Sequence, residues 1–291
     1  MIVITAPTAN IGRQVVADLL ARDTPLRLIA RDPSRLAPEV RERVEVVQGS
    51  HSEPETVEKA FTGAEAVFWL VPSDPHWPSL KDGYVDFARP GVEAFKRHGV
   101  GRVVGISALG RGFDGESGLG AATLRMDDLI AEAGVNFRAL TMPSFMDNTL
   151  RQVASIKNNG VISAPISGDL KAPTCATKDI AAVATRLLLD DTWSGVGSVP
   201  VLGPEDLSFN EMAAIISDVL GKPVRFERTP DEAFKSQLLG FGVSESMAQG
   251  LLDMYTAKDR GMDNALPRTP EGTTPTSFRE WCEQVLVPAM R

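Results

Sequence analysis

The sequence predicts a doubly wound α/β fold, in which helices cover both faces of a parallel sheet. Its 291 residues are 43% hydrophobic and 23% charged, which is typical of a globular chain with a sizeable core. In the first half, short apolar runs rich in β-branched residues alternate with segments of helical periodicity. The connections between them are short, so we expect parallel strands joined by crossover helices.

The predicted strands and helices follow one another regularly up to residue 142. The fourth helix contains Pro90, which lacks an amide hydrogen, so we expect a kink or a restart there. Glycines end the last two helices, at Gly99 and Gly134. Strands are predicted over residues 1–5, 26–30, 44–48, 66–71, 102–107 and 137–142, and helices over 11–21, from 32 onward, 53–61, 84–98 and 124–133.

The second half differs in composition and predicts a smaller C-terminal α/β part. We expect one unit over residues 1–150, with contributions from 174–202, and a smaller unit over 151–291. Residues 160–174 indicate a loop with short strands, 178–189 a helix, 199–202 a strand and 263–276 a long surface loop. Three capping boxes mark helix starts, at Ser208 with Glu211, Thr229 with Glu232 and Ser277 with Glu280.

The composition excludes several classes of protein. The net charge of −8 argues against a nucleic-acid binder, which usually carries a basic excess. No apolar run approaches the roughly 20 residues that cross a bilayer, and the stretch at residues 2–4 is too short for a signal peptide. Cys175 and Cys282 lie far apart, which disfavours a disulfide framework or a zinc site and favours a cytoplasmic location.

The turn after the first strand is the main candidate for a binding site. Residues 5–13, with the sequence Thr-Ala-Pro-Thr-Ala-Asn-Ile-Gly-Arg, leave this strand and open a helix. A doubly wound sheet binds the pyrophosphate of a dinucleotide at this place, on the free amides and the positive dipole end of the helix. The position therefore predicts dinucleotide binding.

In these features the chain resembles the extended and atypical short-chain dehydrogenases, and within them the NmrA-like family, over nearly its whole length. The family pattern Gly-x-x-Gly-x-x-Gly would place glycines at Ala6 and Ala9, so only Gly12 is retained. The resemblance implies an NAD(P)-binding Rossmann fold, in a group of quinone reductases, azo-dye reductases and redox-sensing regulators. It extends through residues 28–33, 63–68, 143–148, 178–181 and 203–208.

Two arginines bear on which dinucleotide is bound. Arg31 stands at the end of the second strand with Arg35 nearby, and an arginine there accommodates the 2′-phosphate of NADP. Asp32 precedes Pro33 and is interpreted as a helix cap rather than as a ribose ligand. We therefore expect NADP(H) to be preferred over NAD(H). The other predicted cofactor contacts are Thr8, Asn10, Ile11, Gly12, Val71, Pro72, Ser107 and Pro143.

The usual catalytic pair of ketone-reducing relatives is missing. They use Tyr-x-x-x-Lys, in which the lysine lowers the pKa of the tyrosine. Here Tyr84 is followed by Ala88 and Tyr255 by Asp259. No catalytic residue is assigned, and His76 and Tyr84 are the candidates.

The three histidines lack metal-ligand spacing, so no metal site is expected. His51 is expected in a loop, and His98 beside the last carbonyls of its helix.

Three loops at the carboxyl ends of the strands are expected to wall a substrate pocket, because ligands bind at that edge of such a sheet. One contains His76 and another follows the sixth strand. The third, over residues 111–120, has four glycines and is expected to act as a mobile lid. The predicted substrate contacts are Trp77, Phe113, Phe145, Met146 and Asn148.

Three functions remain open at this point. The first is an NAD(P)H-dependent oxidoreductase that transfers hydride to a flat, electron-poor small molecule such as a quinone, for which no strong acid is obligatory. The second is an NAD(P)-binding redox sensor without turnover, which needs only differential binding between two states. A lyase or isomerase that has lost the cofactor is a third reading. The expected partners are a small-molecule substrate and, at most, a second copy of the chain in a homodimer, with no nucleic acid or membrane.

Overall fold

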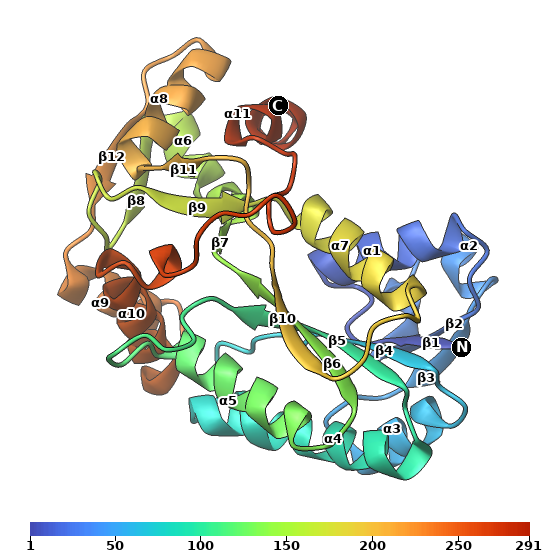
Figure 1. The fold of residues 1–291 in the computed structure, drawn as a ribbon. Coiled ribbons are helices and arrows are strands. Elements are labelled where there is room, and N and C mark those ends of the chain that lie inside the picture. Colours follow the sequence, from blue (N-terminus) through green and yellow to red (C-terminus); the bar gives the residue numbers. More distant parts are fainter.

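A seven-stranded parallel sheet forms the centre of the computed structural model, which describes residues 1–291 (Figure 1). The strand order is β10-β6-β5-β4-β1-β2-β3, and every neighbouring pair is parallel. The order reverses between β1 and β4, so the crevice at their carboxyl ends is the switch point where such sheets bind ligands. The strands are β1 (Ile2–Ile4), β2 (Leu26–Ala30), β3 (Glu45–Gln48), β4 (Ala66–Trp69), β5 (Arg102–Ala108), β6 (Asn136–Met142) and β10 (Val196–Pro200).

Helices cover both faces of this sheet, which confirms the predicted fold class (Figure 1). One face packs on α1 (Asn10–Leu20) and α7 (Thr177–Leu189), and their apolar residues join the first of two large core clusters. The other packs on α3 (Pro54–Phe61), α4 (Phe87–His98) and α5 (Leu119–Ala131), which supply the second. No helix is both long and apolar enough to cross a membrane.

Three helical segments of the first half differ from their predictions. α5 begins at Leu119, five residues before the predicted start at 124, and so includes the end of the predicted loop over 111–120. After Asp32 a single 3-10 turn forms over Pro33–Arg35, followed by the short α2 (Pro38–Arg41), because Pro38 opens a new helix. The irregularity expected at Pro90 lies one turn earlier, in the π-helical turn η2 (Asp82–Asp86) that precedes α4. Pro90 has no amide hydrogen to donate to the carbonyl of Asp86, and the π turn ends at that residue.

The C-terminal part has a core of its own, formed by buried residues between Met146 and Leu286. Its strands make two small sheets, β11-β9-β7 and β12-β8. They are β7 (Ser144–Phe145), β8 (Val161–Ala164), β9 (Ala172–Cys175), β11 (Asp206–Leu207) and β12 (Arg225–Arg228). The helical segments are η3 (Met146–Gln152), α6 (Val153–Asn159), α8 (Phe209–Leu220), α9 (Asp231–Gly240), α10 (Glu245–Asp259), η4 (Met262–Asn264), α11 (Phe278–Trp281), η5 (Cys282–Leu286) and α12 (Val287–Ala289).

The three predicted capping boxes have different outcomes. At Ser208 both reciprocal hydrogen bonds form, which confirms that box. At Ser277 the hydroxyl accepts from the amide of Glu280, whereas the Glu280 carboxylate bonds Lys178. The box at Thr229 is wrong: α9 begins after Pro230, whose fixed φ suits a helix start without a side-chain cap.

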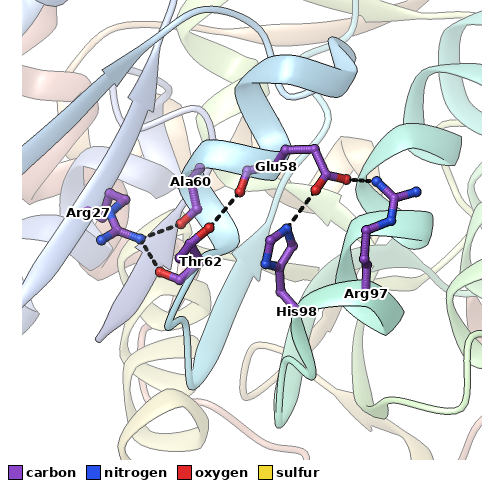
Figure 2. Close-up of polar contacts among 6 residues, drawn as sticks. All are labelled: Arg27, Glu58, Ala60, Thr62, Arg97 and His98. Carbon is purple, nitrogen blue, oxygen red and sulfur yellow. Dashed lines mark hydrogen bonds and ion pairs between the residues drawn. The ribbon is translucent and has the colours of Figure 1, made fainter.

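At the amino edge of the sheet, charged side chains pair with one another (Figure 2). The Arg27 guanidinium donates to the carbonyls of Ala60 and Thr62, both at 2.7 Å, and so satisfies the last carbonyls of α3. Glu58 binds His98 at 2.8 Å and also pairs with Arg97. His98 therefore bonds a carboxylate rather than the helix carbonyls that the sequence predicted.

Candidate functional site

The turn between β1 and α1 is held by Thr5. Its hydroxyl donates to the carbonyl of Phe68 at 3.0 Å and accepts from the amide of Leu70 at 2.8 Å. These bonds join the ends of β1 and β4, the strands at which the sheet order reverses. Thr5 therefore fixes the floor of the crevice.

The two ends of the glycine pattern contact each other across this turn. A Cβ atom on Gly12 would lie 2.2 Å from the carbonyl oxygen of Ala6, so no larger residue fits there without a shift. Ala6 itself has φ +48°, the left-handed region that favours glycine. The third glycine is thus required by the close approach of α1 to the turn, and the first place keeps the glycine conformation with an alanine in it.

The first turn of α1 leaves donors free for an anion. The amides of Asn10, Ile11 and Gly12 donate to no backbone carbonyl, and the N-cap Ala9 has no side-chain oxygen to accept from them. A Ser, Thr or Asp cap would occupy such donors. With the positive end of the helix dipole, these amides suit a phosphate group. Thr8 lies half-buried just before them.

The side chain of Asn10 is occupied by a network that the sequence reasoning missed. Its amide donates to Asp147 at 2.9 Å and to Thr177 at 3.1 Å, and the Thr177 hydroxyl donates to Asp147 at 2.9 Å. The network joins α1 to the segment after β6 and to the start of α7. The backbone amide of Asn10 is therefore the group left for a phosphate. The resembling stretches 143–148 and 178–181 flank this network and were the available signal.

The end of β2 presents two unpaired arginines. Arg31 and Arg35 are exposed and take part in none of the ion pairs. The Asp32 carboxylate between them accepts from the amide of Ser34 at 3.0 Å and from its hydroxyl at 2.6 Å. The Ser34 hydroxyl and amide lower the pKa of Asp32. Asp32 is thus a cap, as predicted.

His51 lies in the turn between β3 and α3, as the sequence predicted, but it is buried, with 4% of its surface exposed. Its ring packs edge-on against Trp69 and Phe87, and Nε2 lies 3.0 Å from the carbonyl oxygen of Leu70. Burial, opposed by the bond to Leu70 and aided by the charge of Arg31, lowers the pKa of His51 to about 3. His51 is therefore neutral and supports the end of β4 from below. Val71 and Pro72, which follow β4, are half-buried.

The loop after β4 is tied to the C-terminal part. The hydroxyl of Ser244, the N-cap of α10, donates to the carbonyl of Trp77 at 2.6 Å. The Trp77 ring lies edge-on to Tyr84, with ring centroids 5.4 Å apart. Burial raises the pKa of Tyr84, opposed by hydrogen bonds with Ser73 and Thr123. His76 is exposed and its ring makes no hydrogen bond, so Trp77 and Tyr84 are brought together without it.

The glycine-rich loop after β5 packs against α10 and η4. A Cβ atom on Gly118 would lie 2.0 Å from the carbonyl oxygen of Gly250, so the two backbones touch. The Arg260 guanidinium lies over the Phe113 ring, 5.5 Å from its centroid. The glycines thus permit close contact with the C-terminal part, and Phe113 is half-buried beneath Arg260.

The carboxyl ends of β5 and β6 hold the remaining predicted residues. Ser107 is buried, pairs in register with Thr141 and donates its hydroxyl to Asp127 on α5. Pro143 is buried after β6, and Phe145 is half-buried against the first core cluster. Met146 is fully buried in the C-terminal core, which leaves it no surface for a ligand, whereas Asn148 is half-buried.

Comparison with known proteins assigns the family. A family model described as NAD(P)H-binding matches residues 8–191, and one described as NmrA-like family matches residues 125–281. The chain belongs to the NmrA-like family. This confirms the resemblance stated from the sequence and the expected NAD(P)H-binding fold.

Two relatives of this NmrA-like protein are named as reductases. The chain is 31% identical to the (4-alkanoyl-5-oxo-2,5-dihydrofuran-3-yl)methyl phosphate reductase of Streptomyces griseus, covering 97% of this chain and 96% of the relative. It is 28% identical to the NAD(P)H azoreductase of Xenophilus azovorans, covering 88% and 86%. The NADPH complex of an NADPH-dependent quinone oxidoreductase from Escherichia coli has the same fold, with a TM-score of 0.80 at 21% identity, covering 98% and 100%.

Proposed function

We propose that this NmrA-like protein catalyses hydride transfer from NADPH to a flat, electron-poor small molecule such as a quinone. That it is an NAD(P)H-dependent oxidoreductase follows from the family and from its reductase relatives. The observation that carries the proposal is the uncapped first turn of α1, whose amides at residues 10–12 are free at the switch point of the sheet.

NADPH is proposed over NADH because of the end of β2. Arg31 and Arg35 have no carboxylate partner there, and Asp32 is engaged with Ser34. A guanidinium binds phosphate through two parallel hydrogen bonds, so both arginines suit a 2′-phosphate. The Asp32 carboxylate, which would otherwise favour the free ribose hydroxyl of NADH, accepts hydrogen bonds from the amide and the hydroxyl of Ser34.

The proposed substrate surface is apolar and comes from both parts of the chain. Trp77, Phe113 and Phe145 are half-buried near the carboxyl edge, and the first two are held by Ser244 and Arg260 of the C-terminal part. We therefore propose residues 1–150, with 174–202, as the dinucleotide unit and 151–291 as the part that closes the substrate pocket. Flat aromatic walls suit a planar acceptor, since ring stacking orients it over the nicotinamide.

The free buried thiols of Cys175 and Cys282 agree with a cytoplasmic location.

The test is an anaerobic assay of NADPH oxidation with a panel of acceptors: a naphthoquinone, an azo dye and a conjugated butenolide. Turnover with at least one acceptor, and a raised KM without loss of kcat in Phe145→Ala, would support the proposal. Calorimetric titration of NADPH is run in parallel. Tight binding without turnover would instead identify a redox sensor, and the absence of binding would exclude both functions.

A further inference from the structure

Asp127 on α5 is a buried carboxyl group that hydride transfer alone does not use. It is 2% exposed, and its Oδ2 accepts the hydroxyl proton of Ser107. Its Oδ1 has no hydrogen-bond partner. A buried carboxylate with one oxygen unpartnered is costly, whereas a protonated carboxylic acid in the same place is not charged.

Ser107 connects this carboxyl group to the edge of the sheet where the acceptor is proposed to bind. It is the second-last residue of β5, and its side chain faces α5 together with Val103 of the same strand. The crevice outside the carboxyl ends of the strands begins one residue later. The Ser107 hydroxyl therefore links the buried acid to the strand end beside the proposed substrate site.

The surroundings of Asp127 favour its neutral form. Burial raises the pKa of Asp127 to about 7; the Ser107 hydrogen bond and the charge of Arg111 oppose this, and the charge of Asp128 adds to it. The turn η2 contributes only Tyr84, which is neutral at this pH because burial raises its pKa. α4 and β6 face α5 through apolar residues of the second core cluster, and α10 through Gly250.

We propose that Ser107 and Asp127 form a proton relay that completes the reduction. This inference rests on the proposed function. Reduction of a quinone to a hydroquinone consumes one hydride, supplied by the nicotinamide, and one proton. With Asp127 protonated on Oδ2, the hydrogen bond between the two side chains reverses, so that Asp127 donates to Ser107 Oγ and the Ser107 proton is free for the acceptor. Ser107 then gives this proton to the acceptor oxygen on which negative charge develops, and its O–H bond is restored by the proton of Asp127. Asp127 is left as a carboxylate and takes a proton from water before the next turnover. Ser107 is thus the catalytic residue and Asp127 its proton source.

The experiment measures the rate constant of hydride transfer by stopped flow from about pH 5.5 to pH 9. Enzyme with bound NADPH is mixed anaerobically with 2-methyl-1,4-naphthoquinone. In the wild type the rate constant should be level below pH about 7 and fall above it, as Asp127 loses its proton. Asp127→Asn and Ser107→Ala should lose this dependence and be at least about tenfold slower at pH 6. The matched control is Asp128→Asn, next on the same helix but exposed. It removes a charge that raises the pKa of Asp127, so it should keep the rate at pH 6 and the fall at higher pH, with that fall moved to slightly lower pH.

The outcomes separate the relay from the proposed function. If the wild type binds NADPH but reduces no acceptor, the proposed function fails and the relay with it. If it reduces the quinone while Asp127→Asn keeps the wild-type pH profile, the relay alone is overturned, even where that variant is less stable. Ser107→Ala gives the same decision if Asp127→Asn does not fold. The infrared band of a buried carboxylic acid should also be present in the wild type at pH 6 and missing in Asp127→Asn; its absence from the wild type overturns the relay without any assay.

Discussion

Charged side chains have partners at the amino edge of the central sheet, whereas two arginines at its carboxyl edge have no ion-pair partner. At the amino edge, Glu58 binds both Arg97 and His98, and Arg27 satisfies two helix carbonyls (Figure 2). At the carboxyl edge, Arg31 and Arg35 have no ion-pair partner, and the first amides of α1 donate to no carbonyl. Groups that are satisfied inside the chain hold the fold together, whereas groups left free at the switch point are available for a ligand.

Two histidines, one near each edge, both have a partner inside the chain but differ in burial. His98 at the amino edge is partly exposed and bonded to a carboxylate. His51 near the carboxyl edge is buried among aromatic rings and bonded to a carbonyl, so it stays neutral. A residue type alone therefore does not predict a role. What decides it is the burial of the side chain and the kind of partner that the fold supplies.

Of the substitutions at the carboxyl edge, Ala9→Val should have the largest effect on NADPH binding. A branched side chain at the N-cap crowds the space that a pyrophosphate needs above the free amides of α1, so NADPH binding should be abolished. Calorimetric titration measures the affinity. The control is Ala17→Val, at an exposed position of the same helix, which should bind normally. Full affinity in Ala9→Val would mean that the cofactor does not cross this turn.

The acid stability of the protein should depend on His51. The pKa of His51 is about 3 in the folded protein and near 6.5 when unfolded. The unfolded state therefore binds more protons between these values, and stability falls as the pH decreases from 6.5 towards 3, by a few kcal/mol. Urea titrations at several pH values measure this loss. His51→Phe cannot take up the proton and should show a shallower decline, while His98→Gln should not change the contribution of His51. An equal slope in His51→Phe and the wild type would refute the assignment.

Arg31→Ala should weaken NADPH binding by about 1–3 kcal/mol and leave NADH binding unchanged, because only NADPH carries the 2′-phosphate. Paired titrations with the two cofactors measure the difference. Arg97→Ala provides the counterpart at the amino edge and should alter neither affinity. Equal wild-type affinities for NADPH and NADH would sink the preference for NADP.

Neither tyrosine should be essential. Tyr84 is buried against Trp77, and Tyr255 packs on Phe234 with ring centroids 5.4 Å apart. The packing of these rings therefore accounts for both tyrosines. Phenylalanine keeps the ring and removes only the hydroxyl. We expect less than about a tenfold loss of kcat in Tyr84→Phe and Tyr255→Phe, or roughly 1.4 kcal/mol. A thousand-fold loss with intact cofactor binding would identify the tyrosine as the acid, since general acids contribute about 10²–10⁴.

Local sequence patterns predicted the sheet and most helices, because periodicity, caps and glycine stops act within one element. The same patterns placed Gly12 and Arg31 at the carboxyl edge. Residues that directly follow a strand of a parallel sheet lie at this edge, so their place in the chain is enough to predict it. They failed at Thr229, because a proline φ opens that helix without help from a side chain.

The sequence could not predict which residues meet across the fold. Asp127 looks like a solvent-exposed acid in Met-Asp-Asp-Leu, and only the packing of α5 on β5 turns it to Ser107. Asp147 and Thr177 lie 30 residues apart and reach Asn10 only when α7 packs beside α1. His51 is buried by Trp69 and Phe87, which come from two later elements. Such contacts depend on tertiary packing, which no short pattern encodes.

Ala6→Gly should have the smallest effect and tests the conformation of the turn directly. Ala6 and Asp23 are the two non-glycine residues with positive φ, at +48° and +50°. Ala6 lies at the carboxyl edge, and Asp23 follows α1 at the amino edge. The left-handed conformation costs an alanine about 1–2 kcal/mol. Glycine removes that cost but gains chain entropy in the unfolded state, of about 0.5–1 kcal/mol.

Ala6→Gly should therefore raise stability by no more than about 1.5 kcal/mol, seen as a higher urea midpoint with an unchanged slope. Asp23→Gly should gain less, because aspartate tolerates the left-handed region better than alanine does and its pairing with Arg43 would be lost. NADPH affinity should persist in Ala6→Gly, since the added freedom lies before the free amides of α1. If Ala6→Gly lowered stability, the methyl group would have to contribute packing that outweighs its strained backbone, and the missing first glycine would be an adaptation of this turn rather than a cost.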